Sequence, residues 1–223
     1  MIDQSQIAKG TVLVGATGFF SGWLRIMKLG PVVPICNYRL RQNSTPYPLQ
    51  YGAGTYSINV YSDKDELKES AQVTFNAPDP DIVFLQPNVN MWFEKNSPCV
   101  NLAKGKTPKQ IWRWMADNCA YDREEAKLIQ AGKKFDYSPH VDEIFRCKKS
   151  ICFGLTALYN SMLRSIGVKA IMCHGNVEGM GYHCWSRVEL STAWVLEDIT
   201  KDLVEKAYQK RRNAAEYEER YRY

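Results

Sequence analysis

The sequence lacks the marks of several protein classes. Its seven cysteines do not form the close-spaced framework of small secreted scaffolds, and their odd number leaves at least one thiol free or paired with another chain. No run of about eighteen apolar residues occurs, so we expect no transmembrane segment. The alternating acidic loop of a calcium site is also missing, and no cofactor is implied.

Strong charge of either sign is missing as well. The formal net charge is +5, and the most basic stretch, residues 209–223, is interleaved with Glu. This pattern predicts a solvated helical tail at the C-terminus and no nucleic-acid partner. The first residues lack the basic-then-apolar pattern of a signal peptide, so we expect a secreted or cell-surface protein if such a peptide was removed, and a cytoplasmic one otherwise. The oligomeric state is left open.

The first 97 residues have the texture of a β-rich domain. Tyr56, Ile58 and Val60 alternate with polar residues, which is the period of a half-buried strand. Further strand candidates, separated by Pro, Gly, Asn and Asp, lie at residues 10–16, 32–40, 71–77 and 81–86. The spacing predicts a small β-sandwich over residues 1–97, with residues 84–100 as an exit linker.

The hydrophobic period changes at Thr107. Residues 107–110, TPKQ, predict a capping box with Thr107 as N-cap, and a helix with an aromatic-rich inner face follows. A second helix is predicted over residues 123–130, and residues 133–147 are predicted to form a polar loop. We therefore expect a second domain over residues 98–223 and an α+β fold for the chain.

One cysteine lies where a helix begins. Apolar residues recur at helical spacing over residues 151–166, with Ser150 as the expected N-cap and Gly167 at the expected C-terminal end. Cys152 falls on the first turn, where unpaired N–H groups and the helix dipole favour a thiolate. A free cysteine is more often a small buried hydrophobe, so this one needs partners to be a nucleophile.

Three strand candidates follow this helix and supply such partners. Residues 169–175, 182–190 and 194–200 predict an antiparallel sheet packed on the cysteine helix. A four-residue turn at Glu189–Thr192 would place His183 directly opposite Asp198. Asp198 would then hold one nitrogen of the imidazole while the other faces the thiol of Cys152.

The segments KKSICFGLTALYNSMLRSIGVKA, YHCWSRVEL and WVLEDIT resemble the transglutaminase-like core, a papain-like family of thiol enzymes. The resemblance covers roughly residues 105–200 and implies that Cys152 is the nucleophile, His183 the base and Asp198 the orienting carboxylate. It implies attack on peptide or protein amides through a thioester, in a protease, amidase, deamidase or cross-linking enzyme, and we expect hydrolysis to dominate over transamidation. Residues 47–61 and 84–89 are similar to the Ig-like β-domain that precedes this core in some bacterial proteins.

Departures from the family pattern and two rival interpretations accompany this resemblance. Ser150 stands where the family usually has Gly, and Ile199 where it has Pro, although all three triad residue types are present. One rival is a catalytically degenerate module that binds protein or glycan. The other is a zinc site built from Cys173, His174, His183 and Cys184; strand alternation argues against it, because adjacent residues point to opposite faces.

Overall fold

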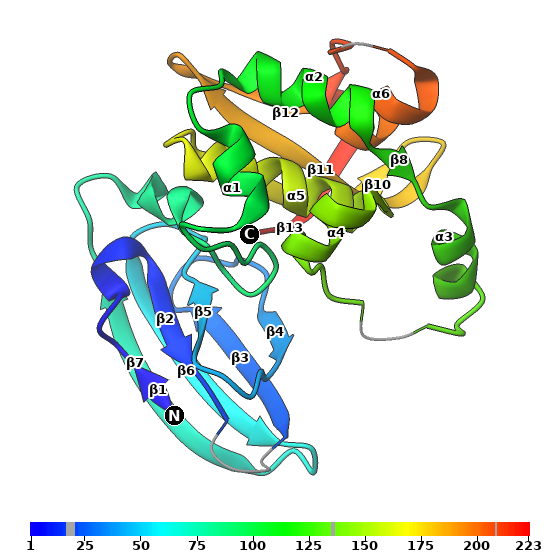
Figure 1. Cartoon of the computed structure of the whole chain (residues 1–223). Coiled ribbons are helices and arrows are strands. Elements are labelled where there is room, and N and C mark those ends of the chain that lie inside the picture. The colour runs from blue at the N-terminus through cyan, green and yellow to red at the C-terminus, as the bar shows by residue number, and fades with distance from the viewer. Residues whose placement is uncertain (17–20, 135–136, 208) are drawn as a thin grey trace. The chain divides into compact units, whose positions relative to one another are not determined.

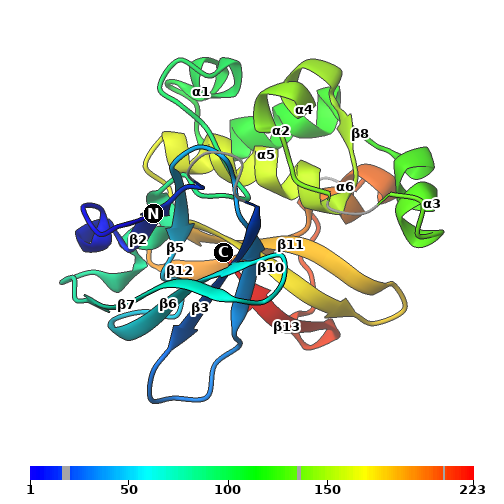
Figure 2. The same cartoon turned by 90° about the horizontal axis from the view of Figure 1, so that it is seen from below.

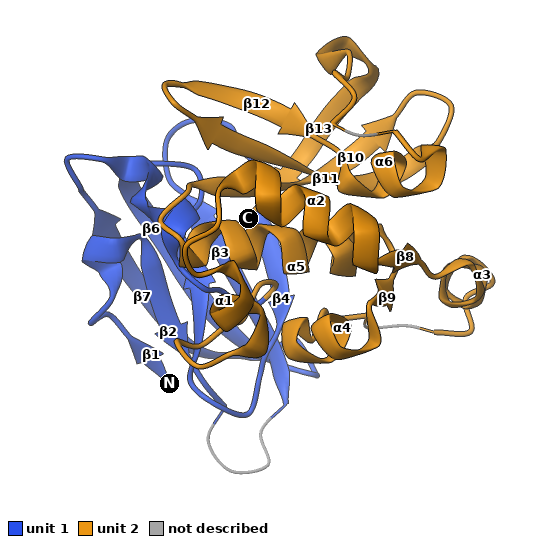
Figure 3. Cartoon of the chain, turned by 45° about the horizontal axis from the view of Figure 1, so that its top comes forward, with its two compact units in different colours: residues 1–89 blue, residues 90–223 orange. Residues whose placement is uncertain are grey.

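The computed structural model describes residues 1–16, 21–134, 137–207 and 209–223. These residues form two compact units, Met1–Val89 and Asn90–Tyr223, which Figure 3 distinguishes by colour. The boundary follows Val89, whereas the sequence analysis placed it after residue 97. Within the described residues, no helix has the length and apolar character needed to cross a membrane.

The first unit consists of two antiparallel sheets (Figure 1). The strand order is β1-β2-β5 in one sheet and β4-β3-β6-β7 in the other. Along β3 and β6, residues such as Leu24, Ile26 and Ile58 are buried and alternate with more exposed neighbours, as a sheet with one covered face requires. The bounds are β1 Ile2–Asp3, β2 Thr11–Val14, β3 Gly22–Lys28, β4 Cys36–Arg39, β5 Thr45–Pro48, β6 Gly54–Ser62 and β7 Leu67–Phe75.

Three segments of this unit differ from the sequence prediction. Residues 81–86 were predicted as a strand but lie in a 3-10 helix, Pro80–Leu85, because Asp79 accepts the Asp81 N–H as an N-cap and proline suits the first position. Strand β5 was not predicted since it contains two prolines; it is an edge strand, the place where a sheet tolerates them. Strand β3 was also missed, although its alternating pattern was available.

The second unit is built around one long helix on an antiparallel sheet. Helix α5 packs against β10 and β11, in a sheet of order β12-β11-β10-β13. Its residues Leu155, Leu158 and Met162 are fully buried in one apolar cluster with residues of α2 and of the sheet. The bounds of the helices and strands in this unit are α1 Pro98–Ala103, α2 Pro108–Asn118, β8 Ala120–Tyr121, α3 Arg123–Gln130, α4 Val141–Cys147, β9 Lys149–Ser150, α5 Cys152–Ser165, β10 Ala170–Val177, β11 Gly181–Leu190, β12 Ala193–Glu197, α6 Ile199–Glu205 and β13 Tyr217–Arg222.

Two predicted helices of this unit begin where the local sequence indicates. The capping box at Thr107 is complete, since its hydroxyl accepts the Gln110 N–H while the Gln110 side chain accepts the Thr107 N–H. Helix α3 covers the predicted residues, with Asp122 as its N-cap. The predicted antiparallel sheet on the cysteine helix is also present.

The predicted helical tail is wrong. Residues 217–222 form β13, which pairs with β10 at one edge of the sheet (Figure 2). Tyr217 is buried while Glu218 and Arg220 are exposed, so the segment has strand alternation that its helix-favouring Glu and Arg obscure. The predicted loop at 133–147 also contains α4, whose Val141 and Ile144 are buried, and the predicted linker at 84–100 contains the start of α1.

Candidate active site

Cys152 is the first residue of α5, and the chain that delivers it is fixed by a short parallel ladder. Strand β9 pairs with β8, and the Asp122 N–H donates to the Ser150 carbonyl at 2.8 Å. The N-cap is Ile151 and contributes no side-chain hydrogen bond, so the prediction of Ser150 as N-cap is wrong. The first-turn N–H groups therefore have no side-chain cap from that position, and the half-buried thiol lies beside them.

Ser150 instead packs against the first turn of α5. Its hydroxyl lies 2.6 Å from the Tyr137 hydroxyl in a partly buried hydrogen bond. Gly154, on the first turn of α5, packs directly on this pair: a Cβ there would lie 2.2 Å from the Ser150 Oγ and 2.5 Å from the Tyr137 Oη. Tyr137 and Gly154 were not predicted from the sequence, and Ser150 was predicted in a different role; the glycine two positions after Cys152 was the available signal.

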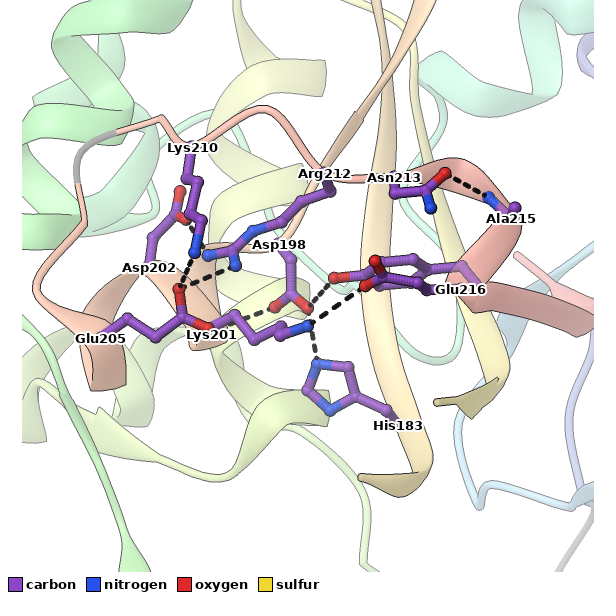
Figure 4. Close-up of polar contacts among 11 residues, drawn as sticks. His183, Asp198, Lys201, Asp202, Glu205, Lys210, Arg212, Asn213, Ala215 and Glu216 are labelled. Carbon is purple, nitrogen blue, oxygen red and sulfur yellow. Dashed lines mark hydrogen bonds and ion pairs between the residues drawn. The ribbon is translucent and has the colours of Figure 1, made fainter. Parts of the chain in front are cut away.

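The structure brings His183 and Asp198 together. The His183 Nε2 lies 3.0 Å from the Asp198 Oδ2, and both residues are buried (Figure 4). The predicted strand register is wrong, however. Leu190 pairs with Ala193, so the turn holds two residues rather than four, and Asp198 lies past the end of β12 as the N-cap of α6.

The carboxylate of Asp198 has further donors on both oxygens. The Lys201 N–H donates to Oδ1 at 2.9 Å, which is the capping bond of α6. The Tyr217 hydroxyl donates to Oδ2, also at 2.9 Å, from the first residue of β13. Tyr217 was not predicted as a site residue, because the basic and acidic residues around it are typical of a solvated tail.

Electrostatics favour a charged pair of His183 and Asp198. Burial works to lower the pKa of His183, but hydrogen bonds and charge from Asp198 and Cys152 outweigh it and raise this pKa to about 9. Burial works to raise the pKa of Asp198, yet the hydrogen bond and charge of His183 hold it below its usual range. Because Nε2 contacts Asp198, Nδ1 is the ring nitrogen left for exchange of a proton with other groups.

The residues proposed for zinc are distributed over both faces of the sheet. His174 pairs with Cys184, while Cys173 pairs with Trp185 and directs its thiol to Glu219 at 3.4 Å. Across the described ranges, no three His, Cys, Asp or Glu side chains gather as a metal site. Burial, with a further contribution from the charge of His183, lowers the pKa of His174 to about 3.

A cysteine at a helix start, together with a buried histidine whose ring contacts an aspartate, is an arrangement that thiol enzymes use. Residues 100–199 match the family described as the transglutaminase-like superfamily. The kyphoscoliosis peptidase of Mus musculus is 32% identical over 105 aligned residues, and that of Homo sapiens 29% over 103. Each alignment covers 41% of this chain, which spans about 15% of the length of these curated relatives.

Two solved structures also align with the chain. One is described as a candidate cysteine protease from Cytophaga hutchinsonii, with a TM-score of 0.47 and 14% identity over 91% of this chain and 75% of that one. The other is the periplasmic domain of TgpA from Pseudomonas aeruginosa bound to ethylmercury, with a TM-score of 0.39 and 12% identity over 92% of this chain and 96% of that one.

Proposed function

We propose that this chain is a thiol enzyme that cleaves amide bonds of peptide or protein substrates through a thioester. The observation that carries the proposal is the His183 imidazole, which is held by the buried Asp198 and whose pKa is raised by Asp198 and by Cys152 at the start of α5. In this assignment Cys152 is the nucleophile, His183 the acid and base, and Asp198 the residue that orients the ring. We further propose that residues 1–89, with their two antiparallel sheets, are an Ig-like module.

The proposed chemistry uses each group at a stated atom. The Cys152 sulfur attacks the amide carbonyl carbon, and the C–N bond breaks as the His183 imidazolium gives its Nδ1 proton to the leaving nitrogen. Water then attacks the thioester carbonyl while His183 takes a proton from it, and the C–S bond breaks. This step releases the carboxylic acid and frees the Cys152 sulfur, with His183 protonated again. The uncapped first-turn N–H of Cys152 and the dipole of α5 stabilise the oxyanion in both steps.

The charge state of His183 suits this order of events. With a pKa of about 9, the ring is mainly protonated at neutral pH and enters the cycle as the acid that the leaving amine needs. The peptide substrate class is supported by the peptidase name of the curated relatives. Hydrolysis is favoured because Cys152 is partly exposed, while Trp185, which could have screened the thioester from water, is buried against Tyr217.

Selective alkylation tests the nucleophile, and the chain supplies an internal control. Five of the other thiols are buried, and burial raises the pKa of Cys99 and of Cys119 to about 12, whereas Cys147 is exposed. With limiting iodoacetamide at pH 7, peptide mapping should find Cys152 modified about tenfold or more faster than Cys147. His183→Ala should bring the two rates together.

Two outcomes would redirect the assignment. Preferential labelling of Cys173 or Cys184 would move the nucleophile to another residue. Equal labelling of Cys147 and Cys152 would favour the degenerate module that binds protein or glycan. The fate of the acyl-enzyme is tested with a glutamine-bearing protein and a fluorescent primary amine, following ammonia and peptide products. Efficient amine incorporation with little cleavage would make transamidation the main reaction.

A further inference from the structure

The Asp198 carboxylate accepts hydrogen bonds from three donors. One of them, Tyr217, lies on β13, which carries none of the three proposed catalytic residues. His183 and Tyr217 share Oδ2, at 3.0 and 2.9 Å, while the Lys201 N–H takes Oδ1. The last torsion of an aspartate side chain is broad, so a single contact would leave its carboxylate free to rotate. Donors on both oxygens fix the plane of the carboxylate, and with it the direction in which it accepts from His183.

Tyr217 is itself held firmly in place. Its residue is 8% exposed, and its ring packs edge-to-face on the buried Trp185, with ring centres 5.1 Å apart. The Lys201 ammonium lies 5.5 Å from the ring centroid and also forms an ion pair with Glu216. Burial, together with the charge and hydrogen bond of Asp198, raises the pKa of Tyr217 far above its usual range, so the hydroxyl remains a donor.

The segment that delivers Tyr217 is anchored to the helix that Asp198 caps. The Arg212 guanidinium is buried against α6, where it pairs with Asp202 and with Glu205, the latter at 2.9 Å (Figure 4). Strand β13 then begins at Tyr217 opposite Val177 of β10. Residues 100–199 are the part that matches the superfamily, so Arg212 and Tyr217 both lie beyond it.

We propose that Tyr217 is a positioning residue of the active site. Strand β13, which lies outside the part that matches the superfamily, thereby supports the triad. The Tyr217 hydroxyl holds Asp198 in the orientation that keeps the His183 ring aimed at Cys152. The proposal rests on the function proposed above for the catalytic step, although the hydrogen-bond arrangement can be measured without turnover.

Tyr217→Phe is the direct test, because it keeps the ring on Trp185 and removes the hydroxyl. We expect kcat for amide hydrolysis to fall about tenfold with KM within about twofold, as for the loss of one hydrogen bond to a charged group. Tyr221→Phe is the matched control on the same strand, since the described contacts give its hydroxyl no hydrogen bond; it should retain wild-type kcat. Unfolding temperatures of both variants check that the strand remains in the sheet.

A double-mutant cycle tests whether Tyr217 acts through Asp198. In an Asp198→Asn background, Tyr217→Phe should change kcat by less than about twofold, because the group it positions has already changed. Full additivity, or a Tyr217→Phe enzyme with wild-type kcat, would overturn the proposal. An inactive wild type with no selectively reactive Cys152 would instead overturn the proposed function.

A measurement independent of activity keeps the two failures apart. The Nε2–H proton of His183 should exchange with solvent about tenfold faster in Tyr217→Phe than in the wild type, as seen by NMR. Unchanged exchange would refute the positioning role even in an inactive protein. If Tyr217→Phe does not fold, 3-fluorotyrosine at this position retains the packing and alters only donor strength. A shift of the His183 Nε2–H resonance then supports the contact, and no shift refutes it.

Discussion

His174 offers a quantitative test of how burial lowers the pKa of a histidine in the second unit. It lies on β10 and is 8% exposed, and within the described residues its Nε2 has no hydrogen-bond partner. The imidazole packs edge-to-face on Phe153, with ring centres 4.6 Å apart, and lies 5.2 Å from the ring of Tyr223. Burial and then the charge of His183 lower its pKa from 6.5 to about 3, so the folded protein holds this ring neutral.

The sign of the pH effect follows from this shift. The unfolded chain binds a proton at His174 as pH falls below 6.5, whereas the folded chain does so near pH 3. The contribution of neutral His174 to stability is therefore complete above pH 6.5 and is lost progressively as pH falls toward 3. Between pH 7 and pH 5, the free energy of unfolding should decrease by about 2 kcal/mol from this group.

His174→Phe isolates the effect, because phenylalanine retains the aromatic contacts and cannot be protonated. Urea unfolding at pH 7 and pH 5, followed by tryptophan fluorescence, gives the two free energies. The signal reports mainly the second unit, since of the six tryptophans only Trp23 lies in residues 1–89. We expect the loss between the two pH values to be about 2 kcal/mol smaller in the variant than in the wild type.

His140→Gln removes an exposed histidine and serves as the control, with the pH dependence of the wild type expected. Equal losses in His174→Phe and the wild type would refute the reasoning. NMR titration of the wild type provides a second check if the variant does not fold. A His174 ring that protonates between pH 7 and pH 5 in the folded protein would contradict the structural argument directly.

The remaining predictions concern the triad and the first turn of α5. His183→Ala should lower kcat by about 10²–10⁴-fold through loss of proton transfer, while Asp198→Asn should leave more residual activity, both measured as steady-state hydrolysis. Because His183 must be protonated to act as the acid and its pKa is about 9, kcat/KM should decline above about pH 9; a rate that rises through that pH would contradict the role. Gly154→Ala should lower the free energy of unfolding by about 1–3 kcal/mol through overpacking against Ser150 and Tyr137. The double variant Gly154→Ala/Ser150→Ala should lose less unfolding free energy than Gly154→Ala, because the Ser150 hydroxyl that the new methyl group meets is gone.

Elements encoded by short-range chemistry could be predicted from the sequence. The capping box at Thr107 fixed the start of α2, and the apolar spacing of residues 151–166 identified the cysteine helix. In both cases a few neighbouring residues carry the signal, and tertiary packing reinforces it.

Elements that depend on distant partners could not be predicted in the same way. Strand β13 takes its conformation from pairing with β10, whose residues lie 40 to 49 positions earlier in the chain, and its Glu and Arg residues favour a helix when considered alone. The prediction of Ser150 as the N-cap of α5 was wrong for a related reason. Ser150 has the composition of a cap, but its hydroxyl is engaged by Tyr137 and its backbone by β8.

The contact between His183 and Asp198 is present, but its physical origin differs from the sequence argument. Strand register was expected to bring the two residues face to face, whereas a two-residue turn ends β12 before Asp198, and the helix N-cap places the carboxylate. Asp198 therefore has two tasks, since one oxygen caps α6 through Lys201 and the other accepts from His183. Asparagine caps a helix about as well as aspartate, so Asp198→Asn removes the charge while α6 keeps its start. Asp198→Ala would remove both, and a loss of unfolding free energy about 1 kcal/mol larger in the alanine variant than in the asparagine variant would separate the capping task from the catalytic one.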